Sequence, residues 1–286
     1  MTVEPIVRTA VVGAGTMGNG IAEVLATAGK RVVLVDVSSS ALERGMQAIR
    51  DRLRRRVQKQ RMTAEEMKQA LNRIESSGDL SAVAEAQLVI EAVVERLDVK
   101  KSLFAQLDEI ADLEAILATN TSSLSVTAIA SATKHPERVI GLHFFNPAPV
   151  MPLVEVVHGP LSEREVVDQA MAFVKEIGKD PVKVTDTPGF LVNRVARSFH
   201  SEAFRLVGDH VAEKQQVDRI LRAAGFPMGP FELQDLIGID INYAASCSVY
   251  EGYFHDPRFR PHPHQRQLVE SGALGKKTGR GHYRYE

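Results

Sequence analysis

The chain has 286 residues, enough for two domains, and its 44% hydrophobic and 25% charged residues are typical of a globular protein. Its formal net charge of −1 gives no global attraction to nucleic acid or to an anionic membrane, so we predict neither partner. A single cysteine, Cys247, allows no disulfide within the chain and fits a reducing compartment, for which we expect the cytoplasm. We expect no secretory signal in MTVEPIVR and no membrane span, because no apolar run approaches the ~20 residues required.

Short apolar runs alternate with longer helical patterns over the first 185 residues. We expect strands at Thr9–Val12, Val32–Val35, Leu88–Val93, Ile116–Ala118, Val139–Phe144, Leu153–Val157 and Val182–Val184. We expect helices at Met17–Ala28, Asp98–Ala111 and Glu163–Ile177. A long helix should begin near Ser39 or Ser40, and another should begin at Thr63–Glu66, which has capping-box spacing. This alternation predicts parallel strands covered by helices.

The strand signals stop after DTPGF, Asp186 to Phe190. A helical face is then predicted from Val195, Phe199, Ala203, Leu206 and Val207, and Gly208, Gly225 and Gly229 divide the remainder into short helices. We therefore predict an α/β Rossmann-type dinucleotide-binding domain at residues 1–185, followed by an all-α helical domain at residues 186–286.

The first predicted strand runs into Gly13-Ala-Gly15-Thr-Met-Gly18, the spacing G-x-G-x-x-G between a strand and a helix. Gly13 permits the turn, Gly15 lets the backbone approach a pyrophosphate on the helix N-terminus, and Gly18 allows close packing. Asp36 ends the next strand, where a carboxylate binds ribose hydroxyls and repels the extra phosphate of NADP. We predict NAD as cofactor, bound by Gly13, Gly15, Thr16, Met17, Gly18 and Asp36; the alternative is a glycine-rich turn in an ordinary α/β domain.

Residues 44–61 hold eight basic side chains and one acid, Asp51. The basic residues are Arg44, Arg50, Arg52, Arg54, Arg55, Arg56, Lys59 and Arg61. Two interpretations remain open at this point. The stretch is either a solvated helix face or a binding site for a small polyphosphate, since no aromatic residues are interleaved as nucleic-acid binding would require.

His143 follows an apolar run and Glu155 lies inside another one. Burying an unpaired charge costs several kcal/mol or shifts the pKa of the group, so two such groups brought together would satisfy each other. A histidine at a strand end is commonly only a hydrogen-bonded core residue. The twelve-residue spacing also fits two neighbouring strand ends joined by the proline-rich turn Asn146–Pro152, which would pair a general base with its counter-charge.

Five further stretches join the glycine loop in carrying a resemblance to a known family: ATNTSSLSVTAIA (118–130), GLHFFNPAPVMPLVEVV (141–157), DTPGFLVNR (186–194), GFPMGPFELQDLIGID (225–240) and GKKTGRGHYRY (275–285). Together they resemble the 3-hydroxyacyl-CoA dehydrogenase family over essentially the full length, most closely its short single-function 3-hydroxybutyryl-CoA dehydrogenases. The resemblance implies NAD-dependent oxidation of a (3S)-3-hydroxyacyl-CoA to the 3-oxoacyl-CoA, and a homodimer formed through the helical domain.

The resemblance also implies roles for individual residues. His143 matches the catalytic base and Glu155 its partner, while Ser122 and Asn193 match groups that position substrate, Ser122 also near the nicotinamide. Cofactor contacts in relatives are matched by Glu95, Lys100, Asn146 and Lys277. Lys59 matches a basic position near the CoA phosphates, and Arg52 stands where some relatives have a serine that touches CoA. Because Asn193 lies beyond the predicted boundary, we expect the site in a cleft between the domains.

Two other functions compete with this one. The same fold and the same His–Glu pair would serve a dehydrogenase of a free hydroxy acid or a sugar acid. A non-catalytic NAD-binding or structural protein is the second alternative. The segment HDPRFRPHPHQR contains His255, His262 and His264, but we expect an exposed, proline-rich loop there and predict no metal site.

Overall fold

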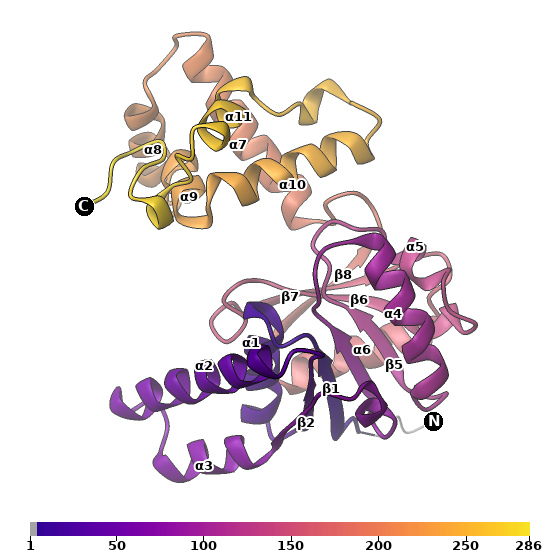
Figure 1. The fold of residues 1–286 in the computed structure, drawn as a ribbon. Helices are drawn as coiled ribbons and strands as arrows, with labels where there is room; N and C mark the ends of the chain where they lie inside the picture. Colours follow the sequence, from indigo (N-terminus) through magenta and orange to yellow (C-terminus); the bar gives the residue numbers. More distant parts are fainter. Residues whose placement is uncertain (1–4) are drawn as a thin grey trace. The chain divides into compact units, whose positions relative to one another are not determined.

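The computed structural model describes residues 5–286 (Figure 1). The chain divides into two compact units, one that ends at Asp186 and one that runs from Thr187 to Glu286. Each unit has its own secondary structure and core. Among the described residues, none of the helices has the length and apolar character needed to cross a membrane.

The first unit is built on an eight-stranded sheet with the strand order β3-β2-β1-β4-β5-β6-β7-β8. Its strands are β1 (Arg8–Val12), β2 (Arg31–Val35), β3 (Ile74–Ser77), β4 (Leu88–Glu91), β5 (Ile116–Thr119), β6 (Val139–Phe144), β7 (Leu153–His158) and β8 (Asp180–Thr185). The pairs are parallel with one exception, since β6 and β7 are antiparallel. Parallel strands need a long crossover, whereas the short turn at residues 145–152 reverses the chain directly.

Within residues 5–186, six α-helices cover this sheet: α1 (Thr16–Thr27), α2 (Ser39–Gln58), α3 (Ala64–Asn72), α4 (Leu97–Ile110), α5 (Val126–Ala130) and α6 (Arg164–Glu176). Alternate residues of β1 belong to different cores, Val11 to one and Ala10 and Val12 to the other. Residues of α1, α2, α3 and α6 pack in the first core and residues of α4 and α5 in the second. The sheet is therefore buried on both faces, as a mainly parallel sheet requires, and the predicted α/β fold is confirmed.

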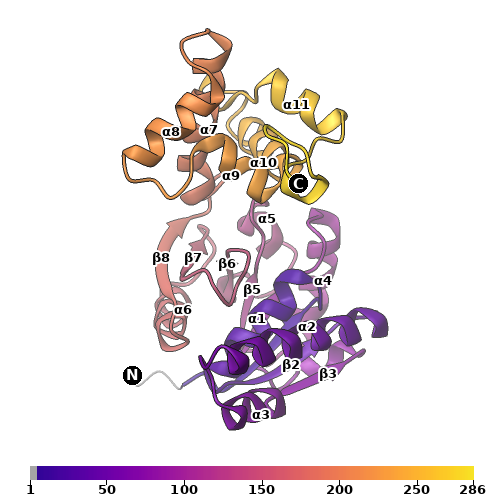
Figure 2. The same ribbon diagram turned by 90° about the vertical axis from the view of Figure 1, so that its left-hand side faces the viewer.

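The second unit consists of helices with two isolated β-bridges near its end (Figure 2). Its α-helices are α7 (Val192–Gly208), α8 (Lys214–Ala223), α9 (Pro230–Ile237), α10 (Ile239–Gly252) and α11 (Pro263–Glu270). The predicted all-helical character is confirmed. The segment expected to be a loop contains the 3-10 turn Pro257–Phe259 and the start of α11, with His262 as the N-cap.

The predicted apolar face of α7 is wrong in part. The buried residues of this helix are Arg197, His200, Ala203 and Phe204, whereas Val195 is 63% exposed. The Arg197 guanidinium donates to the Asn242 carbonyl and to Ser246 Oγ, both at 2.8 Å on α10. These hydrogen bonds satisfy a buried charge, so α7 turns a partly polar face inward.

Two buried histidines make the second unit sensitive to acid. His200 and His282 are each 3% exposed, and among residues 5–286 His200 Nδ1 and both ring nitrogens of His282 have no hydrogen-bond partner. Burial, reinforced by the Arg197 charge, lowers the pKa of His200 to about 3. Burial also lowers the pKa of His282 to about 4, although the Asp235 charge opposes this shift. Both imidazoles are therefore neutral in the folded chain at neutral pH.

We expect this unit to lose stability as the pH falls from about 6.5 towards 4, because the unfolded chain then binds protons that the folded chain does not. For His282 the loss between pH 7 and pH 5 is about 2 kcal/mol. His282→Phe should remove the His282 contribution to this loss of stability, and urea unfolding at pH 7 and at pH 5 would measure the change. The matched change at the exposed His210, His210→Asn, should leave the pH dependence as in the wild type; an unchanged slope in His282→Phe would contradict the prediction.

Candidate functional site

The glycine loop joins β1 to α1, and its glycines meet different constraints. Gly13 has φ +104°, and a Cβ atom there would lie 2.6 Å from the Ala92 carbonyl oxygen. A Cβ atom at Gly18 would lie 1.7 Å from the Gly13 carbonyl oxygen, whereas one at Gly15 would meet nothing within 4 Å. Gly13 and Gly18 thus hold the turn against β4 and α1, and Gly15, the N-cap of α1, faces open space. The amides at this helix N-terminus suit a pyrophosphate.

Asp36 follows β2 and reaches back to this loop. One carboxylate oxygen accepts from the Ala14 amide at 2.8 Å, and the other accepts from the Ser38 amide at 2.9 Å. The half-buried carboxylate therefore lies at the mouth of the glycine loop. The residues present fit a dinucleotide, with a helix N-terminus for its phosphates and a carboxylate for a ribose.

His143 and Glu155 lie directly opposite each other on the antiparallel strands β6 and β7. His143 Nδ1 lies 2.6 Å from Glu155 Oε2, and the two residues are 6% and 0% exposed. With the Glu155 carboxylate as acceptor, this hydrogen bond places a proton on Nδ1 and fixes the orientation of the ring. The ring centroids of His143 and Phe145 lie 4.4 Å apart, so the imidazole has an apolar neighbour as well as a charged one.

The turn at residues 145–152, which connects the two strands, is anchored by hydrogen bonds from Lys179. Lys179 is buried, and its ammonium donates to the Ala148 carbonyl at 2.7 Å and to the Met151 carbonyl at 2.8 Å. On the other side the turn lies close to α1, because a Cβ atom at Gly20 would be 3.3 Å from Ala148 Cβ. Asn146, predicted to contact the cofactor, is an exposed residue of this turn.

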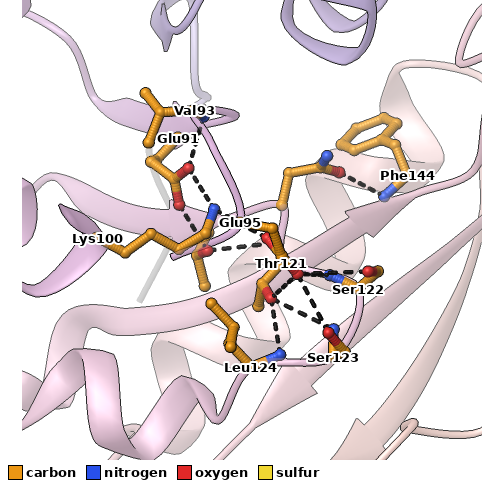
Figure 3. A network of polar contacts seen from close by, with 11 residues as sticks. Glu91, Val93, Glu95, Lys100, Thr121, Ser122, Ser123, Leu124 and Phe144 are labelled. Atoms are coloured by element: carbon orange, nitrogen blue, oxygen red, sulfur yellow. Dashed lines mark hydrogen bonds and ion pairs between the residues drawn. The ribbon is translucent and has the colours of Figure 1, made fainter. Parts of the chain in front are cut away.

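A network of polar side chains, buried at Glu91 and Lys100 and exposed at Glu95, lies at the ends of β4 and β5 (Figure 3). Glu91, which ends β4, accepts from Lys100 Nζ at 2.5 Å and from Thr119 Oγ1 at 2.7 Å. Lys100 Nζ also lies 3.3 Å from Glu95. Glu95 in turn accepts from Thr121 Oγ1 at 2.6 Å and from the Ser122 amide at 2.9 Å.

Lys100 lies inside this network. Its side chain is 1% exposed and ion-paired with Glu91, and its contact with the cofactor stays a prediction. Burial opposes ionisation of Glu95, but the charge of Lys100 and the hydrogen bonds from Thr121 and Ser122 outweigh it and lower the pKa of this carboxyl. Glu95 is therefore a carboxylate that fixes the backbone at Ser122.

The basic side chains of α2 divide into different environments. The Arg52 guanidinium donates to Glu23 Oε2 at 2.5 Å and to Asn19 Oδ1 at 2.7 Å on α1. Burial raises the pKa of Glu23, and the Arg52 charge opposes that shift. Arg52 is thus the counter-charge of a buried carboxylate, while Lys59, the C-cap of α2, is exposed. Contact of either residue with CoA stays a prediction.

Two of the predicted residues belong to the second unit. Asn193 is in the first turn of α7 and is partly buried. Lys277 lies in a 3-10 turn and donates to both carboxylate oxygens of Asp240, at 2.6 and 2.7 Å. Over residues 5–286 no group of three or more histidine, cysteine or acidic side chains is arranged to hold a metal ion.

Glu91 and Lys179 are site residues that sequence reasoning missed. Glu91 ends the apolar run LVIE, and a carboxylate at the end of a buried strand is a signal for a partner such as Lys100, nine positions later. Lys179 gives no such signal, because its partners are backbone carbonyls that a sequence does not mark.

The buried pair Glu91–Lys100 generates a stability prediction. Lys100→Met leaves the buried Glu91 without a counter-charge and should cost about 3–5 kcal/mol of the free energy of unfolding. Glu91→Gln should cost less, because Lys100 keeps Glu95 as a counter-charge at 3.3 Å. The double variant removes both charges, so its loss should be well below the sum of the two. Urea unfolding measures all three, with Lys101→Met, the next residue on α4, as the control. Additive losses would show that the two charges do not depend on each other.

Comparison with known proteins gives the family. Residues 8–187 match the family described as 3-hydroxyacyl-CoA dehydrogenase, NAD binding domain, and residues 189–285 match the corresponding C-terminal domain. The chain is 53% identical to a 3-hydroxyadipyl-CoA dehydrogenase of Escherichia coli over 275 residues, 96% of this chain but 58% of that relative. It is 42% identical to a probable 3-hydroxybutyryl-CoA dehydrogenase of Bacillus subtilis over 277 residues, 96% of both chains.

A solved structure agrees with these matches. The (S)-3-hydroxybutyryl-CoA dehydrogenase of Ralstonia eutropha superposes with a TM-score of 0.95 at 39% identity, covering 99% of this chain and 100% of that one. The predictions of an α/β domain followed by a helical domain, of NAD as cofactor and of a dehydrogenase are confirmed by the matching domains and relatives. The glycine loop and Asp36 lie in the first matched domain and the helical second unit is the other, so the chain is a member of the 3-hydroxyacyl-CoA dehydrogenase family.

Proposed function

We propose that the protein oxidises a (3S)-3-hydroxyacyl-CoA to the 3-oxoacyl-CoA with NAD, and catalyses the reverse reaction, with 3-hydroxybutyryl-CoA as a substrate. The observation that carries this proposal is the buried pair of His143 and Glu155, 2.6 Å apart, in an NAD-binding domain of this family. Relatives named for 3-hydroxybutyryl-CoA and 3-hydroxyadipyl-CoA support the substrate class.

His143 is the general acid–base in this mechanism. Oxidation of the alcohol requires that its hydroxyl lose a proton, and neutral imidazole accepts it near physiological pH. Because Nδ1 is bound to Glu155, Nε2 is the nitrogen that exchanges this proton with substrate. The resulting imidazolium is buried, and the Glu155 carboxylate stabilises it while holding the ring in place.

The other predicted residues orient the reactants. Ser122 and Asn193 are neutral hydrogen-bonding groups that hold the substrate oxygen without competing for the proton. Glu95 supports Ser122 through its amide, and Lys100 acts through Glu95. The glycine loop and Asp36 hold NAD, with Asn146 and Lys277 as further contacts. When bound, NAD supplies the hydride acceptor, so the protein itself provides orientation and proton transfer.

We further propose that residues 186–286 contribute substrate contacts and form a homodimer, in a reducing compartment such as the cytoplasm. Large apolar side chains of the second unit are exposed, which supports an interface there: Val195, Val211, Ile220, Phe226, Ile241 and Phe254. The single cysteine, Cys247, supports the reducing compartment. Sedimentation of the purified chain tests the dimer.

The activity is tested by NADH oxidation with acetoacetyl-CoA, 3-oxoadipyl-CoA and free acetoacetate. The proposal expects turnover of the CoA thioesters and little of the free acid. Equal turnover of free acetoacetate would favour the alternative of a free hydroxy-acid dehydrogenase, and no turnover of any substrate would favour a non-catalytic protein.

Replacing His143 with Gln should lower kcat by roughly 10²–10⁴-fold, the usual contribution of a positioned general acid–base. Glu155→Gln should also lower kcat and move the midpoint of the pH profile to lower pH, because the imidazolium loses its counter-charge. In the wild type, oxidation should speed up and reduction slow down as the pH rises, because oxidation requires a neutral imidazole at His143 and reduction requires the imidazolium. Initial rates across pH 5–9 in both directions measure these effects.

The losses of kcat caused by the two substitutions should not multiply, because the two residues act as one unit. The double variant should therefore lose far less kcat than the product of the two single losses. His135→Gln, at an exposed histidine that also pairs with a glutamate, is the matched control and should keep wild-type kcat. Multiplicative losses would mean that His143 acts without Glu155 or is only a core residue.

Asp36 should set the preference for NADH over NADPH. Asp36→Ala should narrow the preference for NADH over NADPH, chiefly by bringing the KM values for the two cofactors closer together, since no carboxylate then repels the extra phosphate of NADPH. Asp36→Asn keeps an oxygen that accepts from the Ala14 amide but removes the charge. If repulsion decides, both variants narrow the preference in steady-state assays; if only Asp36→Ala does so, the residue acts by holding the loop.

A further inference from the structure

Arg197 on α7 is a buried cation without a counter-charge. The residue is 3% exposed, and among residues 5–286 its guanidinium has no carboxylate within 4.0 Å. Three other buried basic side chains each pair with a carboxylate, namely Lys30, Lys100 and Arg138. Lys179 has no carboxylate partner either, but its ammonium binds two carbonyls of the turn at residues 145–152. Burying an unmatched charge is costly, so packing alone does not explain an arginine at this position.

The hydrogen bonds of Arg197 use only part of its guanidinium. Nε donates to the Asn193 carbonyl at 3.2 Å, and Nη1 donates to the Asn242 carbonyl and to Ser246 Oγ at 2.8 Å and to Asn242 Oδ1 at 3.2 Å. All of these acceptors are neutral. Within the described part of the chain Nη2 donates to none, and it is not sealed from solvent. The side chain is therefore fixed between α7 and α10 while one nitrogen keeps its N–H groups available.

The unmatched charge acts on its surroundings. Burial lowers the pKa of Arg197 to about 10, and no acidic group opposes this shift. The charge of Arg197 in turn helps to lower the pKa of His200, three residues further along α7. An anion bound at Nη2 would offset both effects, because an opposite charge nearby favours the charged form of a buried group.

The position of Arg197 indicates which part of a substrate it would meet. It lies one helical turn after Asn193, on the same face of α7, and four residues of helix rise by about 6 Å. In the proposed mechanism Asn193 holds the substrate oxygen, so Arg197 is within reach of groups a few carbons away from the reacting carbon. The thioester is neutral and the CoA phosphates lie far along the pantetheine arm. A charge at this range must therefore be carried by the acyl chain itself.

We propose that the preferred substrate carries a carboxylate at the far end of its acyl chain, and that Arg197 binds this carboxylate through Nη2. Guanidinium and carboxylate form strong, charge-assisted hydrogen bonds, and Asn242 and Ser246 hold the guanidinium in place before the substrate binds. This inference rests on the proposed function and narrows its substrate class from 3-hydroxyacyl-CoA to dicarboxylic 3-hydroxyacyl-CoA. It makes Arg197 a residue that determines specificity.

The test compares two thioesters of equal chain length, 3-oxoadipyl-CoA, which ends in a carboxylate, and 3-oxohexanoyl-CoA, which ends in a methyl group. Wild-type kcat/KM with NADH should be about 10- to 100-fold higher for 3-oxoadipyl-CoA, the range that hydrogen bonds to charged groups give. Arg197→Gln keeps a donor for the acceptors on α10 but has no charge, so this ratio should fall to about one or below. Arg197→Lys keeps the charge and should retain part of the preference. Arg219→Gln, at an exposed arginine of α8, is the control and should keep the wild-type ratio.

Calorimetry gives a readout that depends neither on turnover nor on a variant. Adipyl-CoA should bind the wild type more tightly than hexanoyl-CoA, and Arg197→Gln should lose that advantage. The inference is overturned, with the proposed function intact, if the wild type turns over 3-oxohexanoyl-CoA as well as 3-oxoadipyl-CoA. It is also overturned if Arg197→Gln keeps the wild-type ratio or if Arg219→Gln loses it. Tighter binding of adipyl-CoA that depends on Arg197, without turnover of any CoA thioester, would instead overturn the proposed function and leave the carboxylate site standing.

Discussion

The antiparallel pairing of β6 with β7 is the constraint on which the candidate site depends. It is the one reversal in an otherwise parallel sheet, and it sets His143 directly across from Glu155. Side chains alternate between the faces of a strand, so a register shift of one residue would point the two groups to opposite faces. The pair is buried and hydrogen-bonded, which makes such a shift costly because each charge would lose its partner. The turn at residues 145–152 therefore requires a firm anchor, and Lys179 holds two of its carbonyls.

Two other buried carboxylates of the first unit follow the same rule, since each pairs with a basic side chain on a different element. Glu91 on β4 meets Lys100 on α4, and Glu23 on α1 meets Arg52 on α2. Such pairs add little net stability compared with apolar packing, but they fix where one element lies against the next. At the ends of β4 and β5 this fixing extends through Glu95 to the amide of Ser122. A polar network in which every group is hydrogen-bonded is rigid, and this one lies at the ends of the central strands β4 and β5, next to Ser122.

Local patterns predicted much of this molecule, and they failed where a partner far along the chain decided the outcome. The glycine loop and the Thr63 capping box are local, and both have the expected geometry. The strand β3 was missed, because IESS has one apolar residue and pairs only along the sheet edge. The inward face of α7 was misjudged because Arg197 finds its acceptors on α10, 45 and 49 residues later. Of the site, the His143–Glu155 spacing was readable from neighbouring strands, whereas the ion pair of Lys100 required the packing of α4 on the sheet.

The two ends of α1 differ in the physical means by which an anion could be held there. Its N-terminus has amides without helical partners and the positive end of the helix dipole, so glycines that expose the backbone are enough to receive a pyrophosphate. Its C-terminus carries the negative end of the dipole, and an anion placed there is disfavoured by the helix itself. Any phosphate at that end must be bound by side-chain cations that outweigh the dipole, and Arg56 and Arg61 reach it from α2 and from the turn that follows.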